Sequence, residues 1–120
     1  MTEKNKLQLQ VNERIERFID NWNDMQSDYE MTQYKRLFTC SAYYRVFVGY
    51  ADETVVLLQS YNTVVAAVVI NGKEVRGYDF LRYVYGYTST SAQHISKFFR
   101  LFKVPYTNRF VWRCAKGGKQ

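Results

Sequence analysis

Hydrophobic residues at the start of the chain recur with a helical period. Between residues 5 and 27 they fall one, three or four positions apart, while acidic and polar residues occupy the positions between them. The apolar stripe consists of Val11, Ile15, Phe18, Ile19, Trp22 and Met25, and Leu7 extends it backwards. The pattern predicts a long amphipathic helix that packs on a sheet. Tyr34, Leu37 and Phe38 also have helical spacing, which predicts a short second helix within residues 29–38.

After residue 40 the pattern changes to one typical of strands. Residues 40–49 and 54–59 are rich in aromatic and β-branched residues and are separated by the turn at 51–53. Residues 63–70 are almost continuously apolar, which predicts a central strand buried on both faces. Asn71-Gly72 predicts a hairpin with a type I′ turn, and residues 74–87 form the next strand or pair of strands. Gly77 and Gly86 indicate a bulge and a strand end.

A second amphipathic helix is predicted over residues 91–103. Thr90 and Gln93 have the spacing of a capping box, and Pro105 is expected to end the helix. Its buried stripe would contain Ile95, Phe98, Phe99 and Phe102, with His94, Lys97, Arg100 and Lys103 nearer the exposed flank. Residues 109–114 alternate as a final strand, with Phe110, Trp112 and Cys114 on one face. Residues 115–120 are expected to be a basic, flexible tail.

Together these elements predict one α+β domain over residues 1–120. Its first part, 1–38, would be helical, and residues 40–114 would form a sheet with one helix. The sheet is expected to be antiparallel with four to six strands, on which the N-terminal helix and the 91–103 helix both pack. A chain of 120 residues is long enough for one hydrophobic core.

Charge is distributed unevenly along the chain. Residues 1–60 carry seven Lys and Arg against nine Asp and Glu, whereas residues 61–120 carry ten against two. The basic second half favours an acidic partner, either nucleic acid or a protein surface, although it could also face the acidic first helix. The chain also holds 11 Tyr and 8 Phe, so some tyrosines are expected on a binding surface or on the exposed faces of strands.

The sequence contains little that could support catalysis. It has one histidine, His94, and two isolated cysteines, Cys40 and Cys114, so neither a catalytic triad, a closed metal site nor a disulfide framework is expected. Glu16, Asp20 and Asp24 lie on one solvated helix face. No cofactor is implied. The polar N-terminus and the lack of a long apolar run favour a cytoplasmic protein without a membrane segment.

The basic residues of the second half are therefore the candidate binding site. Lys97, Arg100 and Lys103 recur every third residue on one helix, and Arg109 and Arg113 share a strand face. Lysines and arginines on one surface, with tyrosines beside them, are what phosphate contact and base stacking require. The predicted nucleic-acid or partner-binding residues are Lys97, Arg100, Lys103, Arg109, Arg113, Arg82 and Tyr87, with further contributions from Arg76, Lys116 and Lys119.

Two segments of the chain resemble a family pattern. They are Ser60-Tyr61-Asn62-Thr63-Val64-Val65-Ala66 and the run from Tyr87-Thr88-Ser89-Thr90 through His94-Ile95 to Phe98. Both resemble small uncharacterised proteins of phages and mobile elements of Gram-positive bacteria, with the pattern S-Y-x-T-x-V-A followed by Y-S-x-T-[ST]-x-x-H-I-x-x-F. Thr88 departs from it, since serine is more usual there. The likeness covers about a third of the chain and excludes the residues before Ser60 and the tail.

The resemblance implies a small sheet module of phage origin and no particular reaction. Small non-enzymatic phage proteins often act on host defence, so the leading hypothesis is an inhibitor of anti-CRISPR type. It would act in the host bacterial cytoplasm on an RNA-guided nuclease, or on its nucleic acid, through the basic surface. The alternative is a DNA- or RNA-binding regulator, which would bind free nucleic acid with a steep salt dependence. A metal-dependent nuclease and an oligomerisation role are further alternatives, which a cleavage assay and a solution mass would test.

Overall fold

The computed structural model describes residues 3–38, 41–61, 63–80 and 89–111. These residues form two helices, six strands and three short 3₁₀ turns, which confirms the α+β class. The helices and strands are α1 (Glu3–Met25), β1 (Glu30–Arg36), β2 (Ala42–Val48), β3 (Thr54–Ser60), β4 (Thr63–Asn71), β5 (Glu74–Asp79), α2 (Ser89–Leu101) and β6 (Arg109–Val111). The turns are η1 (Gln26–Asp28), η2 (Tyr50–Asp52) and η4 (Tyr106–Asn108). The predictions for Gly86, Trp112, Cys114 and the tail lie outside the described residues.

The six strands form one sheet in the order β1-β2-β3-β4-β5-β6. Strands β1 to β5 pair antiparallel with their neighbours in sequence, as expected. The prediction of a wholly antiparallel sheet is wrong at one edge, because β6 pairs parallel to β5. Parallel neighbours need a long crossover connection, and α2 lies within the segment that makes it.

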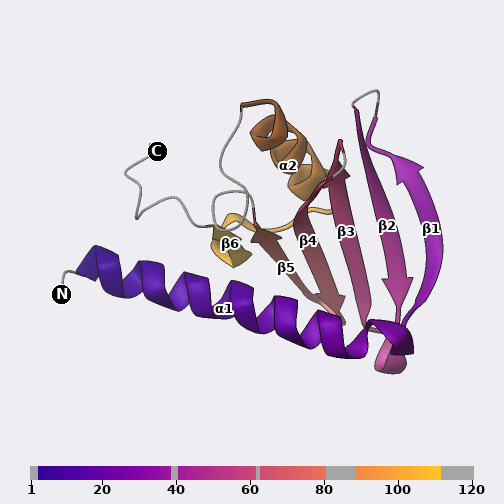
Figure 1. Ribbon diagram of the computed structural model, residues 1–120, viewed down its shortest axis with the longest axis horizontal. Coiled ribbons are helices and arrows are strands. Elements are labelled where there is room, and N and C mark those ends of the chain that lie inside the picture. Colours follow the sequence, from indigo (N-terminus) through magenta and orange to yellow (C-terminus); the bar gives the residue numbers. More distant parts are fainter. Residues whose placement is uncertain (1–2, 39–40, 62, 81–88, 112–120) are drawn as a thin grey trace.

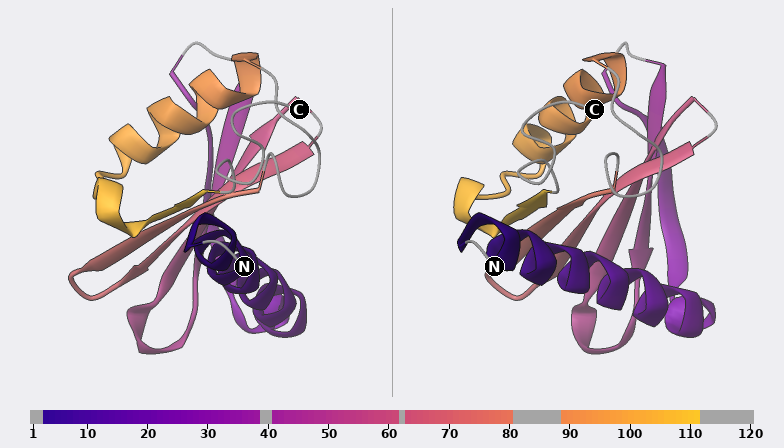
Figure 2. Two further views of the ribbon diagram at one scale, coloured as in Figure 1. Left: turned by 90° about the vertical axis from the view of Figure 1, so that its left-hand side faces the viewer. Right: turned by 60° about the vertical axis from the view of Figure 1, so that its left-hand side comes forward.

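The two helices cover opposite faces of the sheet, so the domain has three layers (Figures 1 and 2). On the α2 side the core includes Val56, Leu58, Phe98 and Phe99, all essentially excluded from water. On the α1 side a smaller core gathers around Ile15, Tyr78 and Phe80. The predicted first helix is confirmed to within two residues at each end. The C-terminal part of its stripe is open to solvent, since Met25 is 43% exposed.

Strand β4 supplies both cores, as its apolar sequence predicted. Ala66 and Val68 belong to the α2 core, and Ala67 belongs to the α1 core. A bulge interrupts the alternation: Leu58 pairs with Ala66 and Gln59 pairs with Val64, which leaves Val65 as the extra residue. Val65 therefore joins the same core as Ala66.

Gly77 does not form the predicted bulge, because its strand pairs with β4 in unbroken register. Its role is to let α2 approach the sheet. A Cβ atom at position 77 would lie 2.8 Å from Phe99 Cε1 and 3.1 Å from Val104 Cγ1, closer than side chains normally pack. The residue is thus required by close packing of the helix rather than by the path of the strand.

The predicted short helix within residues 29–38 is wrong, because residues 30–36 form strand β1. Every residue of β1 is exposed, so the strand has no apolar face that its sequence could reveal. The hairpin after β4 is confirmed, but its turn is displaced by one residue. Asn71 pairs with Glu74, so Gly72 and Lys73 are the central residues, and Gly72 has φ 64°. Glycine in the first central position is typical of a type II′ turn.

Helix α2 begins at Ser89, two residues before the predicted start, so Thr90 lies inside the first turn and not at the N-cap. The helix also ends earlier than predicted, at Leu101 and thus before Pro105. Lys103 adopts φ 57° and its N–H donates to Arg100 O at 3.1 Å, while Val104 N–H donates to Phe99 O at 3.0 Å. These two bonds form a Schellman motif, which satisfies the last carbonyl groups and turns the chain towards η4.

Candidate functional site

Two of the predicted binding residues lie together on α2. Lys97 and Arg100 are exposed, as expected, and with Phe38 and Leu101 they line a shallow hollow of about 280 Å³. Phe38 comes from the end of the β1 hairpin, far away in the sequence. We call these four residues the Phe38–α2 surface. Its lining combines two apolar and two cationic side chains, and among the described residues no acidic side chain lines it.

Phe38 is the most unusual residue of this surface. Its side chain is 58% exposed and its backbone has φ 53°, a left-handed conformation that bulky residues rarely adopt. The preceding residue anchors the turn, because Leu37 is fully buried and its N–H donates to Ala42 O at 2.8 Å. A strained, exposed aromatic residue contributes little to the core, so the feature is better explained by an interaction than by folding.

The other predicted site residues do not join this surface. Lys103 is exposed but lies in the Schellman turn beyond the helix. Arg109 is half-buried: its Nε donates to Val104 O at 3.0 Å, and its Cζ lies 5.5 Å from the ring centre of Phe99. Arg109 therefore ties β6 to the end of α2. Arg82, Tyr87 and Arg113 lie outside the described residues.

His94, expected nearer the exposed flank of its helix as a polar residue beside the apolar stripe, is more deeply buried than that position predicts. His94 is 6% exposed, and its Nδ1 forms a 2.9 Å hydrogen bond with Ser60 Oγ. A serine and a histidine at this distance have the geometry of a nucleophile and its base. Ser60 is only 2% exposed, however, so a substrate could not reach its oxygen. The pair is a buried polar link between β3 and α2.

The buried His94 makes stability depend on pH. Burial, with a smaller contribution from Lys97, lowers the pKa of His94 below its ordinary value of 6.5. The unfolded chain therefore binds the proton more readily. The contribution of neutral His94 to the free energy of unfolding is complete above about pH 6.5. It is lost as the pH falls through the folded-state pKa. We expect the urea concentration at the unfolding midpoint to decrease as the pH is lowered from about 7 to about 5. His94→Gln should make this dependence of the midpoint on pH less steep. An equally steep slope in the variant would assign it to other groups.

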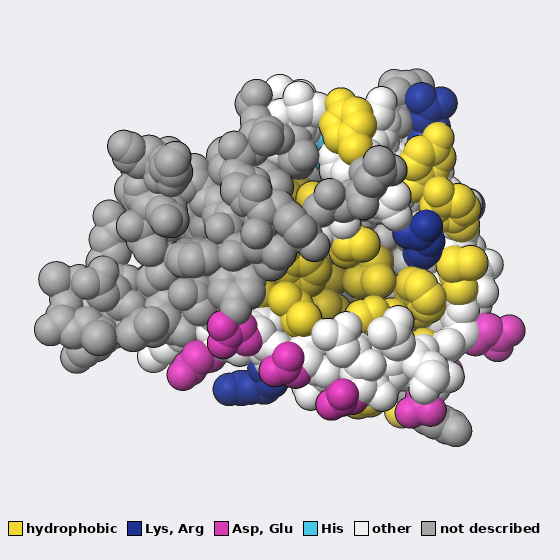
Figure 3. Space-filling view, viewed as in Figure 1, with side chains coloured by type: hydrophobic (Ala, Val, Ile, Leu, Met, Phe, Trp, Pro, Cys, Tyr) yellow, Lys and Arg dark blue, Asp and Glu magenta, His cyan; other side chains and the backbone are white. Residues whose placement is uncertain are grey.

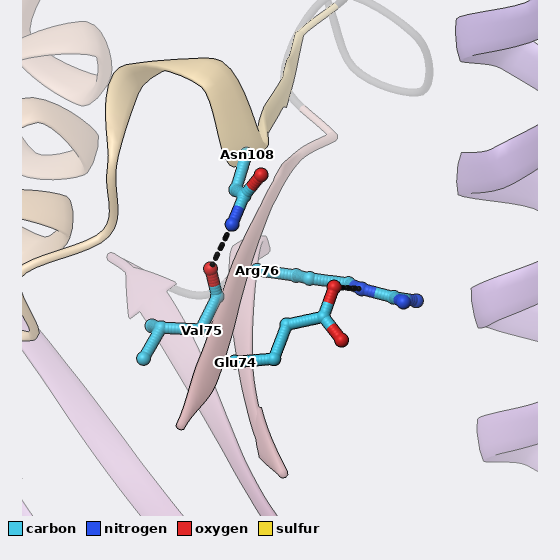
Figure 4. A network of polar contacts seen from close by, with 4 residues as sticks. All are labelled: Glu74, Val75, Arg76 and Asn108. Atoms are coloured by element: carbon cyan, nitrogen blue, oxygen red, sulfur yellow. Dashed lines mark hydrogen bonds and ion pairs between the residues drawn. The ribbon is translucent and has the colours of Figure 1, made fainter. Parts of the chain in front are cut away.

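A groove of about 620 Å³ lies between α1 and the sheet. Its walls carry Arg14 and Arg17 from α1 and Arg76 from β5, and its apolar lining includes Phe18, Trp22, Tyr78 and Phe110. Figure 4 shows one wall: Arg76 Nε donates to Glu74 Oε2 at 2.8 Å, and Asn108 Nδ2 donates to Val75 O at 3.2 Å. The carboxylates of Glu74 and Glu53, which also line the groove, offset two of the three positive charges. The groove therefore has mixed character, with a weak preference for anions.

A second exposed surface lies on the α1 side of the sheet, over β1 and β2. In Figure 3, hydrophobic and basic side chains gather there, whereas acidic side chains follow α1 below. Cross-strand register places Tyr34 opposite Arg45 and Arg36 opposite Tyr43, so aromatic and cationic residues alternate along both strands. We call these four residues the tyrosine–arginine face. Helix α1 leaves it uncovered, because Trp22 contacts Phe47 nearer the other end of β2.

The residues of this face are held in place. The rings of Tyr34 and Tyr43 have centres 5.5 Å apart, and Arg45 Cζ lies 4.7 Å from the centre of the Tyr34 ring. Arg45 Nη1 also donates to Gln59 Oε1 at 2.7 Å. The guanidinium thus has both a stacking and a hydrogen-bonding partner, while Tyr34 remains 54% exposed and Tyr43 37% exposed.

Sequence reasoning missed this face for two reasons. Residues 29–38 were assigned to a helix, in which Tyr34 and Arg36 would point in different directions. The net negative charge of residues 1–60 also predicts no basic surface around Arg36 and Arg45. The acidic residues responsible lie largely on α1, so the charge of the half-chain does not describe this part of the sheet. The signal available was the alternation Tyr43-x-Arg45 within a predicted strand.

Fold and surfaces together describe a small α+β domain with two exposed aromatic and basic surfaces. No three His, Cys, Asp or Glu side chains among the described residues lie close enough to hold a metal ion. Over the described part of the chain, neither helix has the length and apolarity needed to span a membrane. No protein-family model matches the chain, and no curated protein or solved structure shows significant similarity to it.

Proposed function

We propose that this protein is a non-enzymatic binding protein whose Phe38–α2 surface docks onto an acidic surface of a partner protein. The observation that supports the proposal most directly is Phe38 itself, which is exposed and strained and lines the same hollow as Lys97 and Arg100. Protein interfaces are commonly anchored by a few aromatic and arginine residues in an apolar centre with a polar rim. The two cations favour an acidic partner, because opposite potentials speed encounter and exclude wrong partners.

The phage-type sequence pattern suggests which partner to test first. Proteins of that kind often act against host defence, so we propose a nucleoprotein of the host, such as an RNA-guided nuclease, as the target. Inhibition would follow from occupation of a surface that the nuclease needs for its guide or target strand. This step rests on analogy of origin, and the Phe38–α2 surface supports only the binding part of it.

The experiment is capture of host proteins on the immobilised full-length chain, with nuclease treatment, followed by an affinity measurement on the captured protein. Phe38→Gly and Arg100→Glu should each weaken binding at least about ten-fold, since anchor residues contribute 2 kcal/mol or more. Tyr106→Ser is the matched control, because Tyr106 is 72% exposed and does not line the hollow. If an RNA-guided nuclease is the target, its cleavage of DNA should be inhibited by the wild type and not by Arg100→Glu.

Phe38→Gly also separates binding from folding. Glycine adopts a positive φ without penalty, so this variant should be at least as stable as the wild type while it binds less well. The proposal would be rejected if both variants bind the captured protein as tightly as the wild type. Recovery of nucleic acid alone, lost on nuclease treatment, would also reject it in favour of a nucleic-acid-binding regulator.

A further inference from the structure

We infer that the tyrosine–arginine face is a binding site for single-stranded nucleic acid. It lies on the opposite side of the sheet from α2, so the inference is independent of the Phe38–α2 surface. Single strands are commonly bound where aromatic side chains offer flat faces to unpaired bases and nearby cations contact the phosphates. This part of the sheet presents both kinds of side chain in alternation, through Tyr34, Arg36, Tyr43 and Arg45.

The spacing of the aromatic residues suits stacking. Tyr34 and Tyr43 lie diagonally across two strands, and their ring planes are inclined by 36°. Each tyrosine residue keeps more than a third of its surface exposed, so each can receive a base. Tyr61 is also 60% exposed but is not counted in this face, because its ring centre lies 6.1 Å from that of His94 on α2. Two rings in this order would lead a strand from β1 towards β2.

Charge favours a polyanion over other occupants. Arg36 and Arg45 alternate with the tyrosines, and within β1, β2 and β3 the one acidic residue is Glu30, at the far end of β1. A second copy of this chain would place arginine against arginine if the same face met itself, which repels. Double-stranded nucleic acid does not use the rings, because its bases are stacked on each other.

Preorganisation strengthens the inference. Arg45 is fixed by the Tyr34 ring and by Gln59 before any ligand arrives, so less side-chain freedom is lost on binding. Its guanidinium has five N–H donors, and the bond to Gln59 uses one of them. Donors therefore remain for phosphate oxygens beside the stacked base.

The test is fluorescence anisotropy of a labelled single-stranded oligonucleotide with the full chain, at several salt concentrations. Tyr34→Ala and Tyr43→Ala should each weaken binding about five- to hundred-fold, whereas Tyr34→Phe keeps the ring and should bind within a few-fold of the wild type. Arg36→Gln should lower the dependence of log K on log salt by about 0.7, the value for one lost phosphate contact. Tyr106→Ala serves as the control, because it is the same kind of substitution outside this face, and it should leave the affinity for the oligonucleotide unchanged.

The outcomes separate this inference from the proposed function. Phe38→Gly should leave oligonucleotide affinity unchanged, and Tyr34→Ala should leave capture of a protein partner unchanged. Ultraviolet cross-linking of a bromouridine oligonucleotide should label Tyr34 or Tyr43, which gives a positional result that does not depend on substitution. The inference is overturned if the wild type does not bind the single strand at low salt, if a duplex competes equally well, or if the cross-link falls elsewhere.

Discussion

Replacement of Phe98 by alanine is expected to lower the free energy of unfolding by about 3–5 kcal/mol. Phe98 is fully buried and lies at the centre of the α2 core, with ring centres of Phe102 and Phe99 at 5.3 and 6.0 Å. Its removal loses apolar burial and leaves a cavity that the three-layer packing cannot close. Since small domains are stable by only about 5–15 kcal/mol, the variant should lose a large part of its stability.

Urea unfolding followed by tryptophan fluorescence measures this loss. Phe102→Ala is the matched control, because Phe102 directly follows α2 and is only partly buried, so it should lose clearly less. A loss below about 1 kcal/mol for Phe98→Ala would show that α2 does not pack as described.

The second large effect is expected at Gly77, where alanine should destabilise the fold by about 1–3 kcal/mol. The added methyl group would meet the Phe99 ring and Val104, so α2 or the ring must shift. Gly72→Ala provides the comparison. It has no atom within 4 Å of the new Cβ but has φ 64°, so its cost comes from the backbone alone, about 1–2 kcal/mol.

A second substitution distinguishes the two causes. Phe99→Leu frees space above position 77, so it should recover part of the loss in Gly77→Ala and none of the loss in Gly72→Ala. Chemical denaturation of the single and double variants completes the cycle. Strictly additive losses for Gly77→Ala and Phe99→Leu would mean that the methyl group is accommodated elsewhere.

The elements predicted correctly share a dense local signal. The stripe of α1, the apolar run of β4 and the Phe98–Phe99 stripe of α2 each repeat within a few residues, so burial can be inferred from the segment itself. The Gly72 turn was also located, although its register depends on the pairing of Asn71 with Glu74.

The errors have a common physical origin in contacts between distant segments. Strand β1 is exposed throughout and is defined by its pairing with β2. His94 on α2 can be buried because Ser60, on strand β3, provides a hydrogen-bonding partner. The tyrosine–arginine face exists only once β1 and β2 are in register. The exposure of Lys97 and Arg100 could be predicted, because the exposed positions of a helix follow from its hydrophobic period. Phe38 is distant from them in sequence, and only the tertiary structure places it beside them.

The order of the strands has a consequence for how the chain folds. Strands β1 to β5 pair with sequence neighbours, so the sheet can grow by closing short loops, which is the fast route to a sheet. Gly77 and Arg109 pair across the segment that contains α2. This pair can therefore form only after the residues of α2 have been synthesised. During synthesis the N-terminal part leaves the ribosome first. Until α2 follows, Val56, Leu58 and Val68 have no covering layer, so the nascent domain is most exposed to aggregation at that stage.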